Sequence, residues 1–453
     1  MKTNVFVPML LALAVAAPAL AQSGTQLAAN AGEKQPAAVA ETEDTADAAP
    51  AATSVLRPTG VQGLNTFEAP KFTGPFDGIK VSLGGAFALT FQALDHSNTA
   101  APRLDATTGA NLNQLADIRP GINLPNANLN LGVQLAPGIN LVIESYMSSR
   151  HHNEFWVKGG YATIDQSPIN LPALNKVMQY TTIRAGMYEP NYGDALYRRS
   201  DNGNTIQNPF VENYLLDAFT TEPGMDVMVR MGDAFVMGGV TTGQNKGDVK
   251  DGAIGANPAY LAKIGYDRQF NDLVRFRLSG SAYTNESSPA GTLFSGDRAG
   301  SNYWGVVDNS AAAAFTNGRL NPSFRNETTA FQINPFVKVG GLELFGVIEQ
   351  ANGKAANEAD ARTVRQYAGD AIYRFLGDKL YVGGRYNVVK GDLSTSQLDV
   401  SVDRTALAAG WFISPTMLTK VEWVQQNYDG FAATDILNGA EFSGFVVQGA
   451  LSF

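Results

Sequence analysis

Short segments in which apolar and polar side chains alternate recur along the chain from Gly78 to its last residue. Successive side chains of a β-strand point to opposite faces, so each such segment presents one apolar and one polar face. The last segment is the clearest, because counting back by twos from Phe453 gives Leu451, Val447 and Phe445, whereas the positions between them are mostly small or polar. The pattern predicts an all-β protein whose chain ends in a strand.

We predict a strand for each of the alternating segments. They are Gly78–His96, Asn128–Leu135, Ile139–Ser148, Glu154–Asp165, Tyr180–Tyr188, Gly224–Met231, Ala234–Thr242, Ala259–Tyr266, Leu273–Tyr283, Ala330–Val339, Leu342–Gln350, Arg362–Phe375, Leu380–Lys390, Val400–Ile413, Met417–Tyr428 and Ala440–Phe453. The count is therefore about 16. Counts of 14 or 18 are the alternatives, because Pro335 cannot donate to a strand ladder and the 166–178 connection is long for a turn.

The connections between the predicted strands alternate between short and long. The short ones are turns such as Gly232-Asp233, and the long ones, such as 189–223 and 284–326, fall at the opposite end of the strands. Short periplasmic turns, long outer loops and an even strand number are the topology of a transmembrane antiparallel β-barrel in a bacterial outer membrane. A soluble β-sandwich is the alternative, but it has no reason to keep this asymmetry.

The strand at the chain end needs a partner for its free edge. In lipid an unpaired edge leaves backbone groups without hydrogen bonds, so the sheet must close. We therefore expect Ala440–Phe453 to pair with Gly78–His96, with Phe453 at the periplasmic rim. In a soluble protein the same ending would instead be a buried edge strand.

The apolar face of the predicted strands is expected to contact lipid. It carries aliphatic residues such as Ile264, Leu344 and Val382, and aromatic residues gather near the strand ends, for example Trp411 near a turn and Phe442 near a loop. Aromatic side chains in these positions anchor a barrel at the two membrane interfaces.

The first part of the chain differs in composition from the barrel region. Residues 1–21 combine a positively charged start, an apolar stretch and a small-x-small cleavage site, which predicts a secretory signal peptide. Residues 22–75 are rich in Ala, Thr, Pro and Glu, so we expect a low-complexity, flexible periplasmic leader before a barrel at 76–453. The chain has no Cys, so the exported protein forms no disulfides.

Charge and motifs exclude several other classes of protein. The formal net charge of −9 argues against nucleic-acid binding. A hydrolase would need His96, His151 or His152 beside a Ser on the same wall, but His151 and His152 lie at a presumed loop tip. No dinucleotide, Walker or zinc spacing occurs. We expect no enzyme activity, no cofactor and no metal, with catalysis or incidental metal binding at this loop as the alternatives.

The polar face of the predicted strands carries many cationic side chains. A barrel of about 16 strands is too wide for side chains to fill, so we expect an aqueous channel and solvated charges on its wall. The cationic pore-lining candidates are Lys158, Lys263, Arg275, Arg277, Arg385 and Arg404. Rings of Arg and Lys favour anions. A mixed-charge wall of paired ions with weak selectivity is the alternative.

The long connection from Glu189 to Pro223 is the candidate constriction. If it folds into the barrel, it narrows the channel and brings its charges opposite those of the wall. The predicted constriction residues are Arg198, Arg199 and Asp201 of this connection and Arg184 and Arg230 of the wall. Facing charges would set a transverse field and a size limit. An extracellular lid is the alternative.

Several stretches of the chain resemble known porin sequences. Ile183–Pro190 resembles the strand that leads into the third loop of phosphate-selective porin O/P-type and related substrate-selective porins, and Gly224–Val229 fits the strand after that loop. Gly296–Trp304 is similar to a loop motif of such barrels, and Phe453 resembles the carboxy-terminal assembly signal of bacterial outer-membrane barrel proteins. The resemblance covers about 78–453 and implies an outer-membrane diffusion channel, usually trimeric, with the third loop in the pore.

The sequence therefore predicts an outer-membrane porin that lets small hydrophilic or anionic solutes diffuse passively. The long loop has no dense Arg/Lys ladder, which departs from the phosphate-specific pattern. The expected partners are outer-membrane lipid and lipopolysaccharide, the permeating solutes and further copies of the chain in a homotrimer. The alternative functions are a structural or adhesive barrel that acts through its extracellular loops, and an outer-membrane enzyme.

Overall fold

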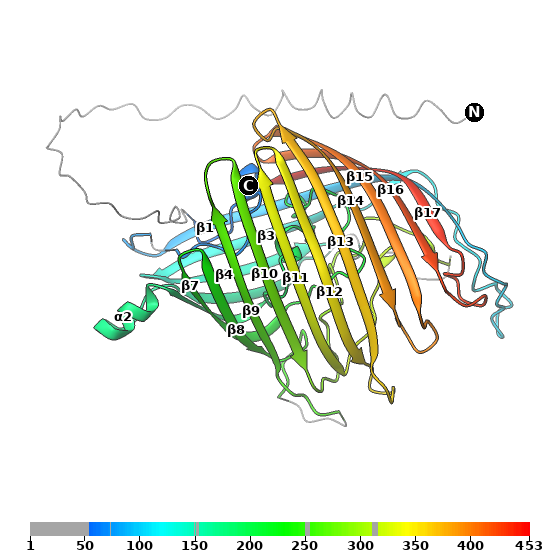
Figure 1. The fold of residues 1–453 in the computed structure, drawn as a ribbon, viewed down its shortest axis with the longest axis horizontal. Coiled ribbons are helices and arrows are strands. Elements are labelled where there is room, and N and C mark those ends of the chain that lie inside the picture. Colours follow the sequence, from blue (N-terminus) through cyan, green and yellow to red (C-terminus); the bar gives the residue numbers. More distant parts are fainter. Residues whose placement is uncertain (1–53, 73, 149, 151–153, 250–253, 310–315) are drawn as a thin grey trace. The chain divides into compact units, whose positions relative to one another are not determined.

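A computed structural model describes residues 54–72, 74–148, 150, 154–249, 254–309 and 316–453. In it, β1 and the fifteen strands β3 to β17 form a closed antiparallel β-barrel of sixteen strands (Figure 1). The two-residue β2 is an additional short pairing on β1. The predicted barrel and its strand number are confirmed. The predicted signal peptide and most of the predicted leader lie outside the described residues.

The strands lie close to their predicted ranges. They are β1 (Lys80–Ser97), β2 (Gly121–Ile122), β3 (Asn126–Ala136), β4 (Ile139–Met147), β5 (Trp156–Ile164), β6 (Thr181–Tyr188), β7 (Glu222–Met231), β8 (Ala234–Thr241), β9 (Ala259–Gln269), β10 (Val274–Asn285), β11 (Glu327–Val339), β12 (Leu342–Lys354), β13 (Arg362–Phe375), β14 (Leu380–Gly391), β15 (Val400–Ser414), β16 (Met417–Asp429) and β17 (Glu441–Ser452). The short helices are η2 (Gly60–Gly63), α2 (Pro172–Met178) and η3 (Ala195–Tyr197). None of the described helices has the length and apolar character needed to cross a membrane.

The first and last strands close the barrel. β1 pairs with β3 on one side and with β17 on the other, in a register that runs from Ala86 opposite Ser452 to Ser97 opposite Glu441. The last residue takes part, because Gly85 and Phe453 exchange two backbone hydrogen bonds of 3.0 Å each. The edge left by the chain end is therefore paired, as the alternation in the sequence predicted.

Two irregularities expected from the sequence have local explanations. The long 166–178 connection contains α2, so it is a helical link between β5 and β6 and not a missed strand. At Pro335 the ladder between β11 and β12 is interrupted, since proline has no N–H to donate. The side chain of Asn334 donates instead to the backbone oxygen of Gly346 on β12 (3.1 Å). The strand therefore continues through the proline.

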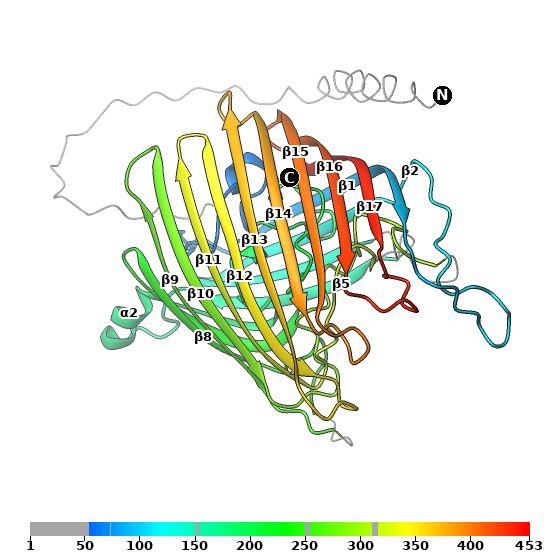
Figure 2. The same ribbon diagram turned by 45° about the vertical axis from the view of Figure 1, so that its right-hand side comes forward.

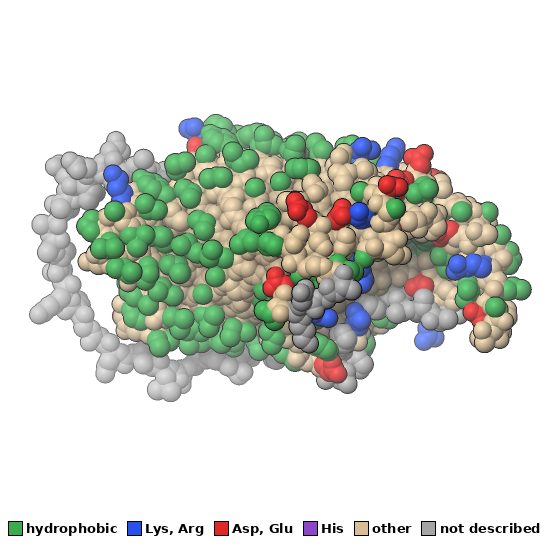
Figure 3. Space-filling model, turned by 90° about the horizontal axis from the view of Figure 1, so that it is seen from below, with side chains coloured by type: hydrophobic (Ala, Val, Ile, Leu, Met, Phe, Trp, Pro, Cys, Tyr) green, Lys and Arg blue, Asp and Glu red, His purple; other side chains and the backbone are tan. Residues whose placement is uncertain are grey.

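Apolar side chains cover the outer wall of the barrel. Ile264 on β9 and Val382 on β14 are 67% and 49% exposed. Figure 3 shows hydrophobic side chains spread over the wall, whereas most charged side chains in that view gather toward one end. Water would strongly disfavour so large an apolar surface, but the hydrocarbon of a membrane solvates it. The barrel is therefore an outer-membrane barrel.

One aromatic residue predicted at the lipid interface points the other way. Phe442 is 1% exposed and its ring packs edge-on against that of Tyr303, with centroids 5.4 Å apart. Even-numbered positions of β17, such as Gln448 and Ser452, point into the barrel, whereas the odd-numbered Phe445 points outward. The prediction for Phe442 is wrong because it followed closeness to a loop and not the parity of the strand.

Candidate pore

The connection between β6 and β7, residues 189–221, runs through the barrel interior, and we call it the inner loop. The backbone N–H of Gly203 donates to Asn128 Oδ1 on β3 (2.8 Å), and that of Asp194 donates to Asn334 Oδ1 on β11 (2.7 Å). β3 and β11 are eight strands apart in a ring of sixteen, so they lie on opposite sides. The inner loop therefore crosses the barrel from one wall to the other.

Lys420 on β16 holds the middle of the inner loop. Its ammonium group donates to the backbone oxygens of Thr205 (2.8 Å), Asn208 (2.9 Å) and Phe210 (2.7 Å). These contacts use all three donors of the ammonium group. An irregular buried segment lacks backbone partners of its own, so a wall side chain satisfies its carbonyl groups.

Replacing Lys420 by Met should destabilise the protein, because three buried carbonyl oxygens lose their donor. An unsatisfied buried group costs about 1–3 kcal/mol, so the free energy of unfolding should fall by about 3 kcal/mol or more. Urea unfolding of the folded barrel in detergent measures this change. Lys379→Met, in the exposed turn between β13 and β14, is the control. Equal unfolding free energies for the two variants would contradict the role given to Lys420.

The two arginines predicted at the constriction belong to the inner loop but pair with different carboxylates. Arg198 Nη2 lies 3.4 Å from Glu343 Oε2 on β12, and Arg199 Nη2 lies 2.5 Å from Asp217 Oδ2 of the inner loop itself. Both arginine side chains are buried. Neither faces the wall arginines that the sequence placed opposite them.

The other three predicted constriction residues have partners of their own, and Asp201 also lies 3.7 Å from Arg199. Asp201 pairs with Lys158 on β5, and Arg184 pairs with Asp226 on the neighbouring strand (2.6 Å). Arg230 donates to a backbone oxygen ahead of β1 (3.1 Å). The predicted facing of Arg198, Arg199 and Asp201 against Arg184 and Arg230 stays a prediction, because the contacts described for these residues are with other groups, as expected for buried charges that are stabilised by opposite charge. Spacing in the sequence does not show which part of the wall the loop crosses.

The predicted pore-lining cations point inward, but most of them are shielded from water. The exposed fractions are 1% for Lys158, 2% for Lys263, 1% for Arg277, 3% for Arg385 and 1% for Arg404, whereas the side chain of Arg275 is 23% exposed. The expectation of solvated wall charges is therefore wrong for the first five. The inner loop fills the space in which they would have met water.

Paired ions make up much of the inner wall. Asp194 of the inner loop lies 2.7 Å from both Lys263 on β9 and Arg277 on β10, and Arg385 on β14 lies 2.7 Å from Asp370 on β13. Buried charges need such partners, since an isolated ion loses its hydration without compensation. For these cations the structure matches the mixed-charge alternative.

Some of the described inward cations contact neutral atoms in place of carboxylates. On the barrel wall they include Arg230, Arg404 and Lys420. The guanidinium of Arg404, for example, donates to Gln426 Oε1 and to the backbone oxygen of Asn213, both at 2.7 Å. The guanidinium charges of Arg230 and Arg404 are not cancelled by a direct ion pair, so they contribute to the field inside the barrel.

The connection between β10 and β11 packs on the inner loop. Asp297 accepts hydrogen bonds from the backbone and side-chain nitrogens of Asn202 (2.8 and 2.9 Å), and the Tyr303 hydroxyl donates to Glu422 on β16 (2.5 Å). The stretch Gly296–Trp304 was singled out in the sequence only for its resemblance, and its structural role was missed. Its density of Gly, Asp, Ser and Asn was the available signal.

The contact between these two loops should weaken as the pH rises. Burial raises the pKa of Asp297 from its ordinary value of 3.8 to about 7, in spite of the nearby charge of Arg199. Between pH 3.8 and about pH 7 the folded state therefore binds more protons than the unfolded state. As a result, the stability of the folded state decreases as the pH rises through this range. Hydrogen-exchange protection of 296–304, corrected for intrinsic exchange rates, should fall over this range in the wild type and stay flat in Asp297→Asn. If the protection of residues 296–304 rose with pH, it would contradict the raised pKa of Asp297.

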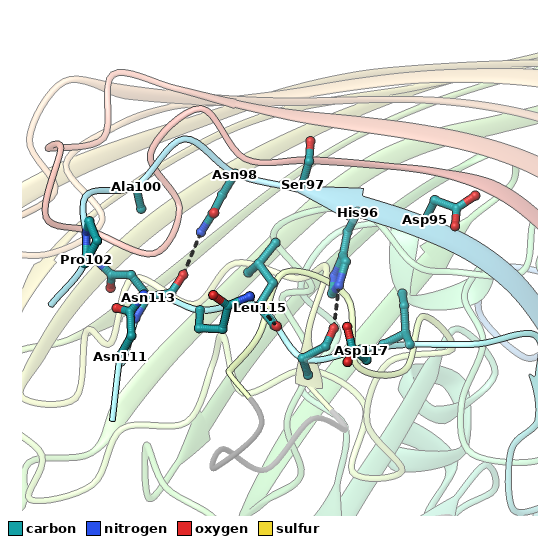
Figure 4. A pocket seen from close by; sticks show the side chains of 13 residues that line it. Asp95, His96, Ser97, Asn98, Ala100, Pro102, Asn111, Asn113, Leu115 and Asp117 are labelled. Carbon is teal, nitrogen blue, oxygen red and sulfur yellow. Dashed lines mark hydrogen bonds between the residues drawn. The ribbon is translucent and has the colours of Figure 1, made fainter. Parts of the chain in front are cut away.

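An open hollow of about 540 Å³ lies among the outer loops that follow β1. Figure 4 shows His96 pointing from the end of β1 toward the loop around Leu115 and Asp117. Its Nδ1 accepts from the backbone N–H of Val307, and Nε2 lies 2.8 Å from the backbone oxygen of Ala116. Both ring nitrogens of His96 therefore contact backbone groups of the outer loops. The other two histidines of the sequence lie outside the described residues.

Comparison with known proteins places the fold in one class. No family model and no curated protein matches this sequence. Among solved structures, the outer-membrane channel DcaP of Acinetobacter baumannii is similar with a TM-score of 0.51 and 12% identity, over 83% of this chain and 98% of that one. The anion-selective porin from Comamonas acidovorans is similar with a TM-score of 0.50 and 11% identity, over 83% of this chain and 100% of that one.

These likenesses show that the chain has the fold of bacterial outer-membrane porins. At this level of identity they concern the fold alone. The phosphate-selective subfamily that the sequence motifs resembled is not confirmed.

Proposed function

We propose that this chain is an outer-membrane porin through which small hydrophilic solutes diffuse passively, along a path that the inner loop narrows. The observation that carries the proposal is the inner loop itself, which is bonded to β3 and to β11 inside the barrel. A segment fixed across the lumen limits the size of the solutes that pass and exposes them to the charges beside it.

We further propose a preference for anions. The support is the pair of inward arginines whose direct contacts are neutral, Arg230 and Arg404. The paired ions around them, such as Lys263 with Asp194, cancel much of their own field at a distance. The expected preference is therefore moderate, and it does not single out phosphate.

The proposal includes no catalytic step and no cofactor. Both ring nitrogens of His96 contact loop backbone. The proposed partners are outer-membrane lipid and lipopolysaccharide around the wall, hydrophilic solutes in the pore and two further copies of the chain. Export through the predicted signal peptide at 1–21 is part of the same proposal.

A second candidate is a structural or adhesive barrel that acts through its outer loops. It is favoured by one observation, the near-complete burial of Lys158, Arg277 and Arg404 where an open channel would expose them. It predicts no ion current, and loss of surface binding when 284–326 is deleted.

Current measurements in planar lipid bilayers separate the two candidates. The purified barrel should produce discrete conductance steps, and in a salt gradient the reversal potential should have the sign of an anion-preferring pore. A barrel that inserts without producing steps would overturn the porin proposal. A reversal potential of the opposite sign would overturn the anion preference alone.

A further inference from the structure

Residues 54–72, ahead of β1, cross the periplasmic mouth of the barrel, and we call them the strap. Near its start, Leu56 packs on Gly132 of β3. The strap then passes the turn between β15 and β16, where the backbone N–H of Val61 donates to the oxygen of Pro415 (2.8 Å). In Figures 1 and 2 its blue trace lies beside the C-terminus. The first half of the strap therefore follows the rim formed by the short turns.

The second half of the strap reaches a different part of the rim. The backbone oxygen of Ala69 accepts from Arg230 on β7 (3.1 Å), and the Lys71 ammonium donates to the backbone oxygen of Met178 at the end of α2 (2.7 Å). The strap thus touches β3, the β15–β16 turn, β7 and the β5–β6 link. Contacts at such widely separated strands mean that it lies over the opening and not along one wall.

The centre of the strap is fixed by an aromatic ring and a carboxylate. Phe67 is 3% exposed and packs edge-on against Phe336 on β11, with ring centroids 5.4 Å apart. Glu68 lies 3.0 Å from Lys263 Nζ and 2.8 Å from Arg277 Nη2. Burial would raise the pKa of Glu68, but these two cations outweigh burial and hold its pKa below the usual range. The Glu68 carboxylate is therefore ionised where it contacts Lys263 and Arg277.

The charges of Lys263 and Arg277 are neutralised even without Glu68. Lys263 and Arg277 each keep Asp194 of the inner loop as a second partner at 2.7 Å. Removal of the strap would leave both cations paired, and the released carboxylate would regain its hydration. The penalty for an unpaired buried ion, which usually makes such contacts permanent, is therefore absent on the wall side.

We propose that the strap is a gate at the periplasmic mouth, latched by the ion pairs of Glu68 with Lys263 and Arg277. This inference rests on the proposed porin function. The latched strap blocks the exit from the barrel, and its release lets solutes that have passed the inner loop reach the periplasm. The strap governs the fraction of time that the pore is open, whereas the inner loop governs the conductance of the open pore.

Glu68→Gln tests the latch in single-channel recordings. The amide keeps the shape of the side chain but removes its charge, so the ratio of open to closed time should rise about tenfold or more, since a buried ion pair is broken. The conductance of each open event should not change. Glu358→Gln is the matched control, because it removes a carboxylate paired with Arg362 (3.1 Å) at an outer turn.

A thiol label reports strap release independently of current. The chain contains no Cys, so Phe67→Cys introduces a single thiol at a site that is 3% exposed when the strap is latched. A maleimide added to the folded protein should react several-fold faster with the Phe67→Cys, Glu68→Gln double variant than with Phe67→Cys alone. Heat-modifiable migration on gels shows that each variant is folded.

The outcomes separate the gate from the porin function. A longer open time with unchanged unit conductance, together with faster labelling, supports the gate. If the wild type and Glu68→Gln conduct with the same open fraction, the strap is a fixed part of the wall and the gate is overturned while the porin remains. If the wild type, Glu68→Gln and Glu358→Gln all fail to conduct, the porin proposal fails and the gate fails with it.

Discussion

Replacing residues 196–212 of the inner loop by a flexible Gly-Ser linker should raise the conductance of each open event by about threefold or more, because the replacement removes the proposed constriction. The expectation follows from the bonds that this segment makes to the wall, such as those from Lys420 to Asn208 and Phe210. The fraction of open time should rise as well, because the strap loses the contacts of Asn65 with Arg198 and of Phe67 with Tyr197. Single-channel recording at fixed salt and voltage gives both quantities.

The matched control for this replacement is the deletion of residues 245–249, which lie exposed between β8 and β9. It removes only exposed residues of this connection, so the unit conductance should stay at the wild-type value. Unchanged conductance in the inner-loop variant would contradict the idea that this segment forms the constriction. A smaller conductance would show that the segment holds the pore open.

Neutralising the cations that lack a carboxylate contact should reduce the preference for anions. Arg230→Gln and Arg404→Gln each remove a positive charge whose direct contacts are neutral. A unit charge a few ångströms from the permeating ion changes its energy by about 1 kcal/mol even when solvent screens it, which corresponds to roughly a fivefold change in the permeability ratio. The reversal potential in a salt gradient should therefore move toward zero in each variant and further in the double variant.

Arg268→Gln serves as the control for selectivity. Its side chain is 50% exposed at the end of β9, outside the lumen, where solvent and salt screen its charge. Its reversal potential should equal that of the wild type. An equal shift of the reversal potential in Arg268→Gln and in the two lumen variants would contradict a specific role for the lumen cations. It would indicate that the total charge of the protein sets the selectivity.

The strands could be read from the sequence because their signal is local. The predicted range Arg362–Phe375 is that of β13, and the predicted closing pair of Ala440–Phe453 with Gly78–His96 is that of β17 with β1. Lipid outside and polar contacts inside impose a period of two on every strand, so a few neighbouring residues suffice to recognise it. Phe442 was misplaced only because its parity was not followed.

The contacts inside the barrel could not be read in the same way. Arg199 was recognised as part of the candidate constriction, but its partner is Asp217 of the same loop and not a wall arginine. Nothing in the spacing of residues 54–72 indicated that Glu68 would pair with Lys263. A lumen side chain finds its partner by the path that an irregular segment takes through space, and no periodicity records that path.

By itself, the sequence determined that this protein is an outer-membrane β-barrel of about 16 strands that ends on a paired strand at Phe453. Alternation, turn lengths and the need to satisfy every backbone group in lipid were sufficient for that. Only the tertiary structure decided that the lumen is crossed by the inner loop and that the mouth is crossed by the strap. The reason is that these two segments are held by bonds between residues far apart in the sequence, such as Lys420 with Asn208, which are 212 positions apart.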